Sequence, residues 1–225
     1  MKLIFRKVYF IITFTLLSTY AMSQSLTFLA LGDSYTIGES VEERLRWPVQ
    51  LAQQLSNEEI SIDDPVIVAT TGWTTDELMN GIEEADLVEE YDIISLLIGV
   101  NNQYRGYPFS QYEKEFTELV EIAESKLSVG GTLFFVSIPD YGVTPFGQKK
   151  NPNQIAKELD RYNEYAKSVA NDRGYLFFNI TEVSRKAIND LSLVASDELH
   201  PSGKMYTQWV EVILPGIQNK LSTKR

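Results

Sequence analysis

The stretch "YDIISLLIG", Tyr91 to Gly99, decides the fold class of this 225-residue chain. It is almost continuously apolar, whereas a strand with one face in water would alternate apolar and polar residues. Continuous apolarity is typical of a strand that is covered on both faces, as strands of parallel sheets are. Four similar short runs occur elsewhere: "LTFLAL" (26–31), "PVIVAT" (65–70), "TLFFVSI" (132–138) and "YLFFNI" (175–180).

Three helical patterns separate these runs. One begins at Thr74, where Glu77 completes a capping box, and a second begins at Ser110, with Glu113 in the same role. The residues that recur at helical spacing are Leu78, Ile82 and Ala85; Tyr112, Phe116, Leu119, Val120, Ala123 and Leu127, ended by Gly130 and Gly131; and Ile155, Leu159, Tyr162, Ala166 and Val169, ended by Gly174. The alternation of strand and helix predicts an α/β domain, a doubly wound parallel sheet with helices on both faces.

The first 23 residues have the composition of a signal peptide. Three basic residues precede the apolar run "VYFIITFTLLSTY", and small residues follow at 21–23. The run is about 13 residues long, shorter than the roughly 17 to 25 residues that a membrane-spanning helix needs. We therefore expect export to a periplasm or the cell exterior, cleavage near Ser23, no membrane span in the mature protein, and one domain over residues 24–225.

The charge and the residue usage exclude several classes of function. The chain has 20 Lys and Arg against 31 Asp and Glu, and without the three basic residues of the leader the balance is 17 against 31, a net charge of −14. Such an acidic surface repels phosphate backbones, so nucleic acid is not an expected partner. The chain has no cysteine and one histidine, which excludes disulfides and the usual zinc and iron sites. No metal or cofactor is expected.

Candidate functional residues follow the predicted strands, because ligands bind at the carboxyl ends of the strands in open parallel sheets. The first strand runs directly into Ser34, the second ends just before Gly72, and the third ends just before Asn101. Each residue type is also common in turns. Here a serine could act as a nucleophile, while a glycine N–H and an asparagine amide could offer fixed donors to a ligand.

The single histidine, His200, lies after the last predicted strand in the stretch "SDELHPSGK" (196–204). Asp197 stands three positions before it. A carboxylate so close in sequence can accept the Nδ1 proton and fix the tautomer, which leaves Nε2 free to take a proton from a serine. A lone histidine is often a surface or capping residue, but a serine needs a neighbouring base to become a useful nucleophile.

In these blocks the chain resembles the SGNH hydrolases, also called GDSL hydrolases. The matching residues are Gly32-Asp33-Ser34, Gly72, Gly99-Val100-Asn101 and Asp197 to His200, in the family's order across the mature chain. The resemblance implies a three-layer α/β/α sandwich similar to flavodoxin, with a five-stranded parallel sheet, and activity on esters or thioesters without a cofactor. It also implies that Ser34 is the nucleophile, His200 the base and Asp197 its orienting acid. The Ser34 N–H, the Gly72 N–H and the Asn101 amide would form the oxyanion hole.

The resemblance departs at Asn102, where many members have aspartate. We expect a differently braced pocket there, not a loss of activity. The candidate substrate contacts are Trp73, Asn102, Tyr104 and Arg105, with Tyr107, Phe109 and Phe146 as further aromatic candidates and a long loop over residues 139–153 that exceeds the usual connection length.

The expected reaction is hydrolysis of a carboxylic ester, with a small-molecule or polysaccharide ester as the substrate. Removal of small acyl groups such as acetyl from carbohydrate fits an exported acidic esterase with aromatic loops. Three alternatives remain: a lysophospholipase or thioesterase for longer acyl chains, an acyltransferase with the same triad, and an inactive sugar-binding module. The intact set of Ser34, His200 and Asp197 disfavours the last, because a binding module does not need all three.

Overall fold

The computed structural model describes residues 25–57 and 60–223. The expected signal peptide, residues 1–23, lies outside the described residues. Within them, no helix is both long enough and apolar enough to cross a membrane.

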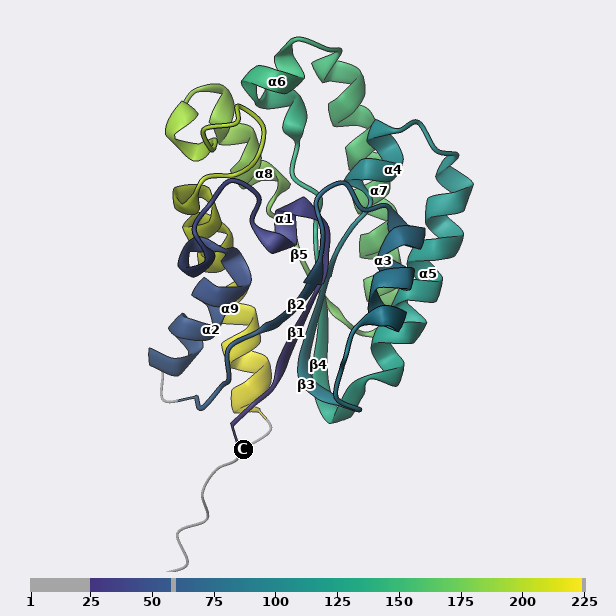
Figure 1. Ribbon diagram of the computed structural model, residues 1–225, viewed down its shortest axis with the longest axis vertical. Helices are drawn as coiled ribbons and strands as arrows, with labels where there is room; N and C mark the ends of the chain where they lie inside the picture. The colour runs from purple at the N-terminus through teal and green to yellow at the C-terminus, as the bar shows by residue number, and fades with distance from the viewer. Residues whose placement is uncertain (1–24, 58–59, 224–225) are drawn as a thin grey trace, which may run out of the picture.

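A five-stranded parallel sheet forms the centre of the molecule (Figure 1). The strands are β1 (Phe28–Gly32), β2 (Val66–Ala69), β3 (Tyr91–Leu97), β4 (Leu127–Val136) and β5 (Leu176–Phe178). They pair in the order β2-β1-β3-β4-β5, and every pair is parallel. This is the strand order of doubly wound, flavodoxin-like sheets, so the predicted fold class is confirmed.

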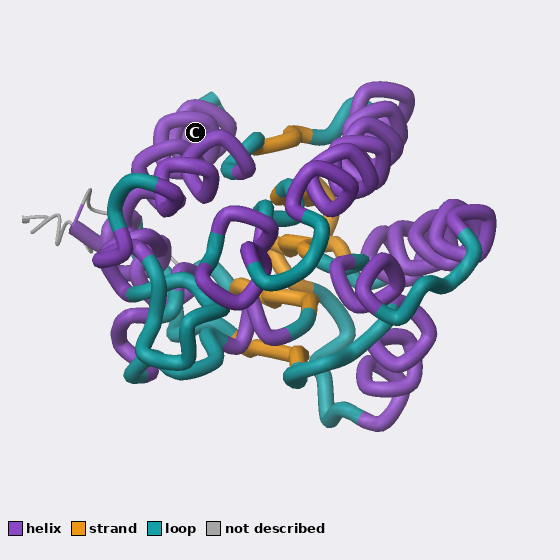
Figure 2. The backbone as a smooth tube through the Cα atoms, turned by 90° about the horizontal axis from the view of Figure 1, so that it is seen from above, coloured by secondary structure: helices purple, strands orange, loops and turns teal. Residues whose placement is uncertain are grey.

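Helices cover both faces of the sheet, as the view from above shows (Figure 2). One layer contains α2 (Trp47–Asn57) and α9 (Gly203–Ser222), and the other contains α3 (Thr75–Glu84), α5 (Phe109–Ser125) and α7 (Pro152–Arg173). The short helices are α1 (Ser34–Ile37), α4 (Val100–Tyr104), α6 (Pro145–Gln148) and α8 (Thr181–Arg185), with 3₁₀ turns η1 (Glu43–Leu45), η2 (Tyr141–Val143), η3 (Lys186–Ile188) and η4 (Leu191–Leu193). α1, α4 and α6 lie near the carboxyl ends of the strands (Figure 1).

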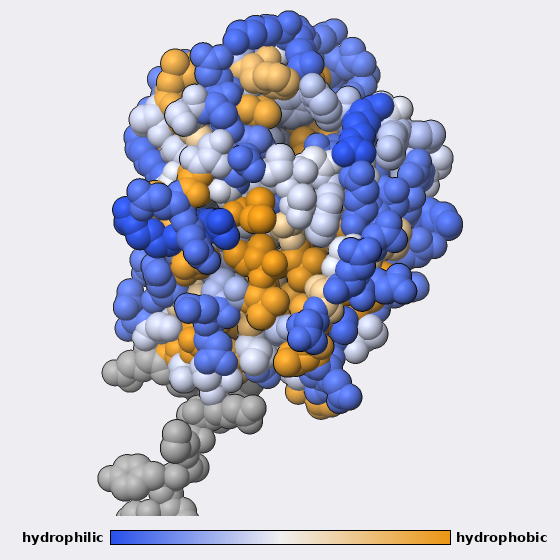
Figure 3. Space-filling view, viewed as in Figure 1, coloured by the Kyte–Doolittle hydropathy of each residue, from blue (hydrophilic) through white to orange (hydrophobic). Residues whose placement is uncertain are grey.

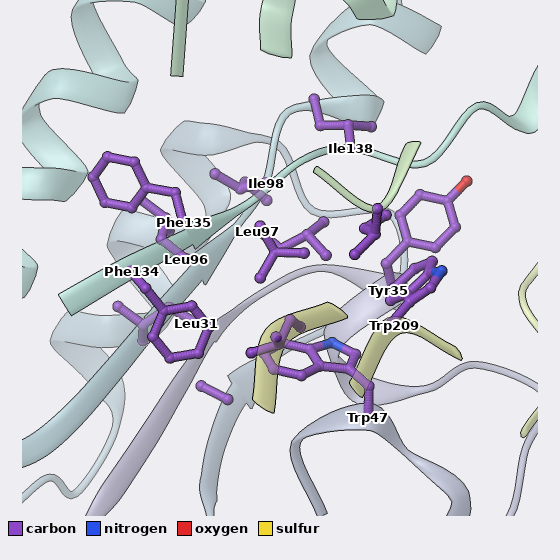
Figure 4. Close-up of a cluster of buried hydrophobic side chains, with 14 of the residues drawn as sticks. Leu31, Tyr35, Trp47, Leu96, Leu97, Ile98, Phe134, Phe135, Ile138 and Trp209 are labelled. Atoms are coloured by element: carbon purple, nitrogen blue, oxygen red, sulfur yellow. The ribbon is translucent and has the colours of Figure 1, made fainter. Parts of the chain in front are cut away.

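Two adjacent residues of β4 show why the apolar run has no polar alternation. Phe134 packs against Trp47 of α2, with ring centroids 6.4 Å apart, while Phe135 points to the other face and packs against Phe116 of α5 at 5.3 Å. Successive side chains of a strand point to opposite faces, so a sheet between two helical layers needs apolar residues at every position. Figure 4 shows this core around the central strands.

The edge strand β2 is the exception to this burial. Val66 is 41% exposed, although Val68 and Ala69 further along the strand are buried. The space-filling view shows an apolar strip over this edge of the sheet, framed by polar residues of the helices on either side (Figure 3).

One predicted helix has different ends in the structure. α5 begins at Phe109, and the preceding Pro108 makes no side-chain cap. Ser110 therefore lies inside the helix, and the predicted capping box of Ser110 and Glu113 is wrong. The helix ends at Ser125, and Gly130 and Gly131 belong to β4. The register shift between β3 and β4 falls here, and Gly130 adopts φ +78°. A positive φ favours glycine at an irregularity in a strand just as it does at the end of a helix.

The other two predicted helices are confirmed. Thr74 and Glu77 form both halves of the capping box of α3, with the Glu77 carboxylate accepting from the Thr74 N–H at 2.9 Å. α7 ends at Gly174, whose φ of +75° is the left-handed cap that glycine favours.

Candidate active site

The nucleophile candidate stands at a tight strand-to-helix turn. β1 ends at Gly32, where an added Cβ would lie 2.5 Å from the carbonyl oxygen of Leu97, so the turn leaves no room for a side chain. Asp33 caps the following helix, because its Oδ1 accepts from the Tyr35 N–H at 3.0 Å. Ser34 is therefore the first residue of α1, at the carboxyl edge of the sheet.

Asp33 itself is fully buried, and its Oδ2 has no hydrogen-bond partner among the described residues. Burial raises the pKa of this carboxyl from its ordinary value of 3.8 to about 7, and the hydrogen bond from the Tyr35 N–H only partly offsets the effect. A buried carboxyl is costly to ionise without partners. The sequence gives no signal for this, since Gly-Asp-Ser is an ordinary turn composition.

The histidine and its acid are in direct contact. His200 Nδ1 lies 2.6 Å from Asp197 Oδ2, while Asp197 Oδ1 accepts from the N–H groups of Leu199 and His200, both at 2.9 Å. The imidazole is buried, at 8% exposure, and meets the edge of the Tyr35 ring at 5.7 Å.

The Asp197 carboxylate is strongly stabilised in its charged form. Burial raises its pKa, but hydrogen bonds from the Ser40 hydroxyl, the His200 ring and the backbone outweigh this and hold the pKa at about 2. The group is therefore an anion near neutral pH, and it can stabilise an imidazolium.

Ser34 and His200 line the same pocket, which has a volume of about 160 Å³. No hydrogen bond joins the Ser34 hydroxyl to the ring or to any other described residue. Hydrogen bonds between catalytic groups are often long before substrate binds. The three residues predicted as a triad thus meet at one edge of the sheet, with the serine hydroxyl still free.

Two backbone donors near the pocket are unused. Within residues 25–57 and 60–223, neither the Ser34 N–H nor the Gly72 N–H has a hydrogen-bond acceptor. Gly72 adopts φ +91°, a conformation that favours glycine. Unsatisfied buried N–H groups are uncommon in folded proteins, so the N–H of Ser34, a buried residue that lines the pocket, indicates a place for a ligand oxygen.

Asn101 joins the second and third strand ends. Its Nδ2 donates to the Trp73 carbonyl at 2.9 Å, and the residue also lines the pocket. An amide nitrogen carries two hydrogens, so one N–H fixes the side chain beside Gly72 and the other is available to a ligand. Gly72 itself is not among the residues that line the pocket.

Aromatic side chains form part of the pocket lining. Tyr104 contacts Tyr141 at 6.1 Å and Phe146 at 6.2 Å between ring centroids, and all three line the pocket with Leu199. Tyr104 is 49% exposed and reaches the pocket mouth. Two of these, Tyr104 and Phe146, were predicted; Tyr141 and Leu199 were not, because nothing in the sequence says which residue of a long loop turns inward.

The other predicted substrate contacts do not line this pocket and make contacts within the protein. Asn102 is completely buried, and its amide accepts from the Thr75 N–H at 3.1 Å and donates to the Thr75 hydroxyl at 2.7 Å. It therefore braces the start of α3 and does not touch the pocket. Arg105 donates to the Gly72 carbonyl at 2.6 Å and pairs with Glu77, while Trp73 packs against Gly81 of α3. Phe109 packs against Tyr112 and Tyr162.

None of the described residues form a group of three or more His, Cys, Asp or Glu that could hold a metal ion. The site's chemistry is that of a serine, an imidazole, a carboxylate and fixed N–H donors.

Comparison with known proteins finds relatives that are named as esterases. Over 145 residues the chain is 32% identical to a multidomain esterase of Ruminococcus flavefaciens, a match that covers 60% of this chain and 18% of that protein. It is 26% identical over 147 residues to an acetylxylan esterase of Geobacillus stearothermophilus, covering 59% of this chain and 62% of the relative. The chain therefore spans less than two thirds of each relative's length.

Solved structures share the fold at low identity. TesA superposes with a TM-score of 0.68 at 15% identity, covering 86% of this chain and 99% of that one. Axe2 from Geobacillus stearothermophilus, an acetylxylan esterase, superposes with a TM-score of 0.66 at 20% identity, covering 84% and 93%. The model of the GDSL-like lipase/acylhydrolase family matches residues 30–208, which include the carboxyl end of every strand of the sheet. The chain belongs to the GDSL-like lipase/acylhydrolase family.

Proposed function

We propose that this protein is an exported serine esterase that removes small acyl groups, such as acetyl, from carbohydrate. The observation that carries the proposal is the pocket of about 160 Å³ that is lined by Ser34, Asn101 and His200 together with the aromatic rings of Tyr104, Tyr141 and Phe146. Sites for drug-sized ligands are larger, roughly 300–1,000 Å³, so this one favours a short acyl group.

The proposed chemistry is acyl transfer to water in two steps. The Ser34 oxygen bonds to the ester carbon while its proton passes to His200 Nε2, and the carbonyl oxygen becomes an oxyanion. The free N–H groups of Ser34 and Gly72 and the Asn101 amide would stabilise that charge. The carbon–oxygen bond to the alcohol then breaks, and the alcohol leaves with the proton from His200.

The second step repeats the first with water. Water gives a proton to His200 and adds its oxygen to the acyl carbon, after which Ser34 leaves with that proton. The Asp197 carboxylate stays ionised throughout and stabilises the imidazolium at Nδ1, which its pKa of about 2 supports.

Carbohydrate as the substrate rests on the pocket mouth and on the relatives. The exposed Tyr104 ring is a flat apolar surface beside the acyl site, with hydrogen-bonding groups close by. The curated relatives are named as a multidomain esterase and an acetylxylan esterase. Export rests on the composition of residues 1–23 and is tested by sequencing the amino terminus of the protein recovered outside the cytoplasm.

The test of the activity is a series of nitrophenyl esters from acetate upward, together with acetylated xylo-oligosaccharides, and with Ser34→Ala as the control. We expect hydrolysis that is greatest for acetate and absent in the variant. A maximum at longer chains would instead support a lipase or thioesterase, and transfer to an added sugar in place of water would support an acyltransferase. Sugar binding without Ser34-dependent acetate release would leave only the binding module.

A further inference from the structure

A serine on the nucleophile loop contacts the predicted acid of the triad. The Ser40 hydroxyl donates to Asp197 Oδ2 at 2.7 Å, across 157 residues of sequence, and the same oxygen contacts His200 Nδ1 at 2.6 Å. The preceding residue, Glu39, accepts a hydrogen bond from the hydroxyl of Thr71, next to Gly72. Residues 39 and 40 thus connect the loop that carries Ser34 to the two other loops of the site.

The backbone at Ser40 is unusual for a serine. Among the described non-glycine residues only two have a positive φ, Ser40 at +64° and Glu198 at +66°, and Glu198 directly follows Asp197. The donor of the hydrogen bond therefore lies in left-handed backbone, and the acceptor directly precedes a residue in that conformation, which is unfavourable for residues with a Cβ. Glycine would adopt this backbone without that cost, so the reason for a serine here is its side chain.

The two oxygens of Asp197 are held in different ways. Oδ1 is fixed by two N–H groups of its own loop, whereas the partners of Oδ2 among the described residues are the Ser40 hydroxyl and the His200 ring. If Ser40 loses its hydroxyl, the carboxylate is freer to turn about its Cβ–Cγ bond. Because Ser40 lies at an exposed position, water can then compete for Oδ2.

We propose that Ser40 is a positioning residue that holds Asp197 Oδ2 against His200 Nδ1 and so keeps the imidazole aligned for proton transfer. The inference rests on the proposed triad, but it concerns a contact that exists whether or not the chain hydrolyses esters. Ser40 acts through Asp197 and touches no substrate.

Three substitutions separate the hydroxyl from the backbone. Ser40→Ala removes the donor and keeps a Cβ at positive φ, Ser40→Gly removes the donor and relieves the strain, and Ser40→Asn supplies an amide donor on a residue that tolerates this φ. Ser125→Ala is the matched control, because Ser125 is an exposed serine at the end of α5, before the amino end of β4, and its hydroxyl bonds only to the Ile122 carbonyl.

In ester hydrolysis we expect the Ala and Gly variants to lose about 10-fold in kcat with little change in KM, the scale of one hydrogen bond to a charged group at a site open to water. The Asn variant should recover part of the loss, and Ser125→Ala should match the wild type. If the Gly variant keeps full kcat while the Ala variant does not, Ser40 serves only the loop backbone and the proposal is wrong.

A second measurement does not depend on activity. The chain has one histidine, so in protein without a histidine tag the imidazole NMR signals belong to His200. Without the Ser40 donor, Asp197 Oδ2 is held less firmly against His200 Nδ1, so the downfield NMR signal of the proton between them should broaden as that proton exchanges with water.

The two measurements fail in different ways. Absence of Ser34-dependent hydrolysis in the wild type would refute the proposed function, and the His200 signal would still decide whether Ser40 acts on the pair. An identical signal of the proton at His200 Nδ1 in the wild type and in the Ser40→Gly variant would refute the positioning role itself.

Discussion

Replacing the buried Asp33 by asparagine should make the protein more stable at alkaline pH. The Asp33 carboxyl has a pKa of about 7 in the folded protein, against an ordinary value of 3.8, chiefly because it is buried. Above pH 3.8 the unfolded chain therefore holds fewer protons at this group than the folded protein does. The free energy of unfolding then falls as the pH rises, until the folded carboxyl also ionises near pH 7.

The magnitude follows from the two pKa values. A difference of about 3 units at ~1.4 kcal/mol per unit gives a loss of ~4 kcal/mol in total, of which ~3 kcal/mol falls between pH 5 and pH 8.5. This is an upper limit, because the surroundings of a buried charge relax. The Asp197 carboxyl, with its pKa of about 2, loses its stabilising contribution only as the pH falls below about 4, so it does not affect this window.

The assay is urea unfolding of the wild type and of Asp33→Asn at several pH values between 5 and 8.5. With a slope of about 2 kcal/mol per molar urea, the wild-type midpoint should fall by roughly 1.5 M across the window, while the variant's midpoint stays nearly level. Asparagine can keep the capping bond to the Tyr35 N–H, since its Oδ1 is also an acceptor.

Asp172→Asn, on the exposed side of α7, is the control and should follow the wild type. The reasoning is refuted if the Asp33→Asn variant shows the same pH slope as the wild type, because the buried carboxyl would then not be the group that titrates.

Three further predictions test the site. Asn101→Ala should lower kcat by roughly 100- to 1,000-fold, the usual loss for one oxyanion donor, and near-normal turnover with nitrophenyl acetate would show that Asn101 only forms a turn. Asn102→Ala should lower the free energy of unfolding by about 2 kcal/mol, because the Thr75 N–H loses its buried acceptor; a large rise in KM without loss of stability would return Asn102 to the substrate contacts. Removal of metal ions with EDTA should leave kcat unchanged, since the proposed steps use only side chains and water, and a loss restored by one added metal would contradict them.

The sequence predicted the fold through the strands and the helix caps that carry strong local signals. The five apolar runs all became strands, and Gly174 and the pair Thr74 and Glu77 ended and began helices as expected. The ends of α5 were wrong because the glycines at 130 and 131 sit in an irregular strand, and local sequence does not distinguish that use of glycine from a helix end. α2 and α9 were not predicted.

The candidate site shows the same division. Ser34 and Asn101 could be located because they directly follow strands, whose carboxyl ends the topology brings to one edge, and His200 because it is the single histidine; the three do line one pocket. The direction in which side chains on loops point could not be predicted. Asn102 differs from Asn101 by one position, yet it points into the core, and Tyr141 lines the pocket from inside a long loop. Which way such side chains turn depends on packing that no short stretch of sequence encodes.

The placement of the two ends of the domain has a practical consequence. β1 begins and α9 ends at the amino edge of the sheet, opposite the short helices that surround the pocket (Figure 1). A tether at either end of the described domain would therefore leave the pocket facing outward, so the protein could be immobilised on a resin or displayed on a particle with Ser34 still accessible.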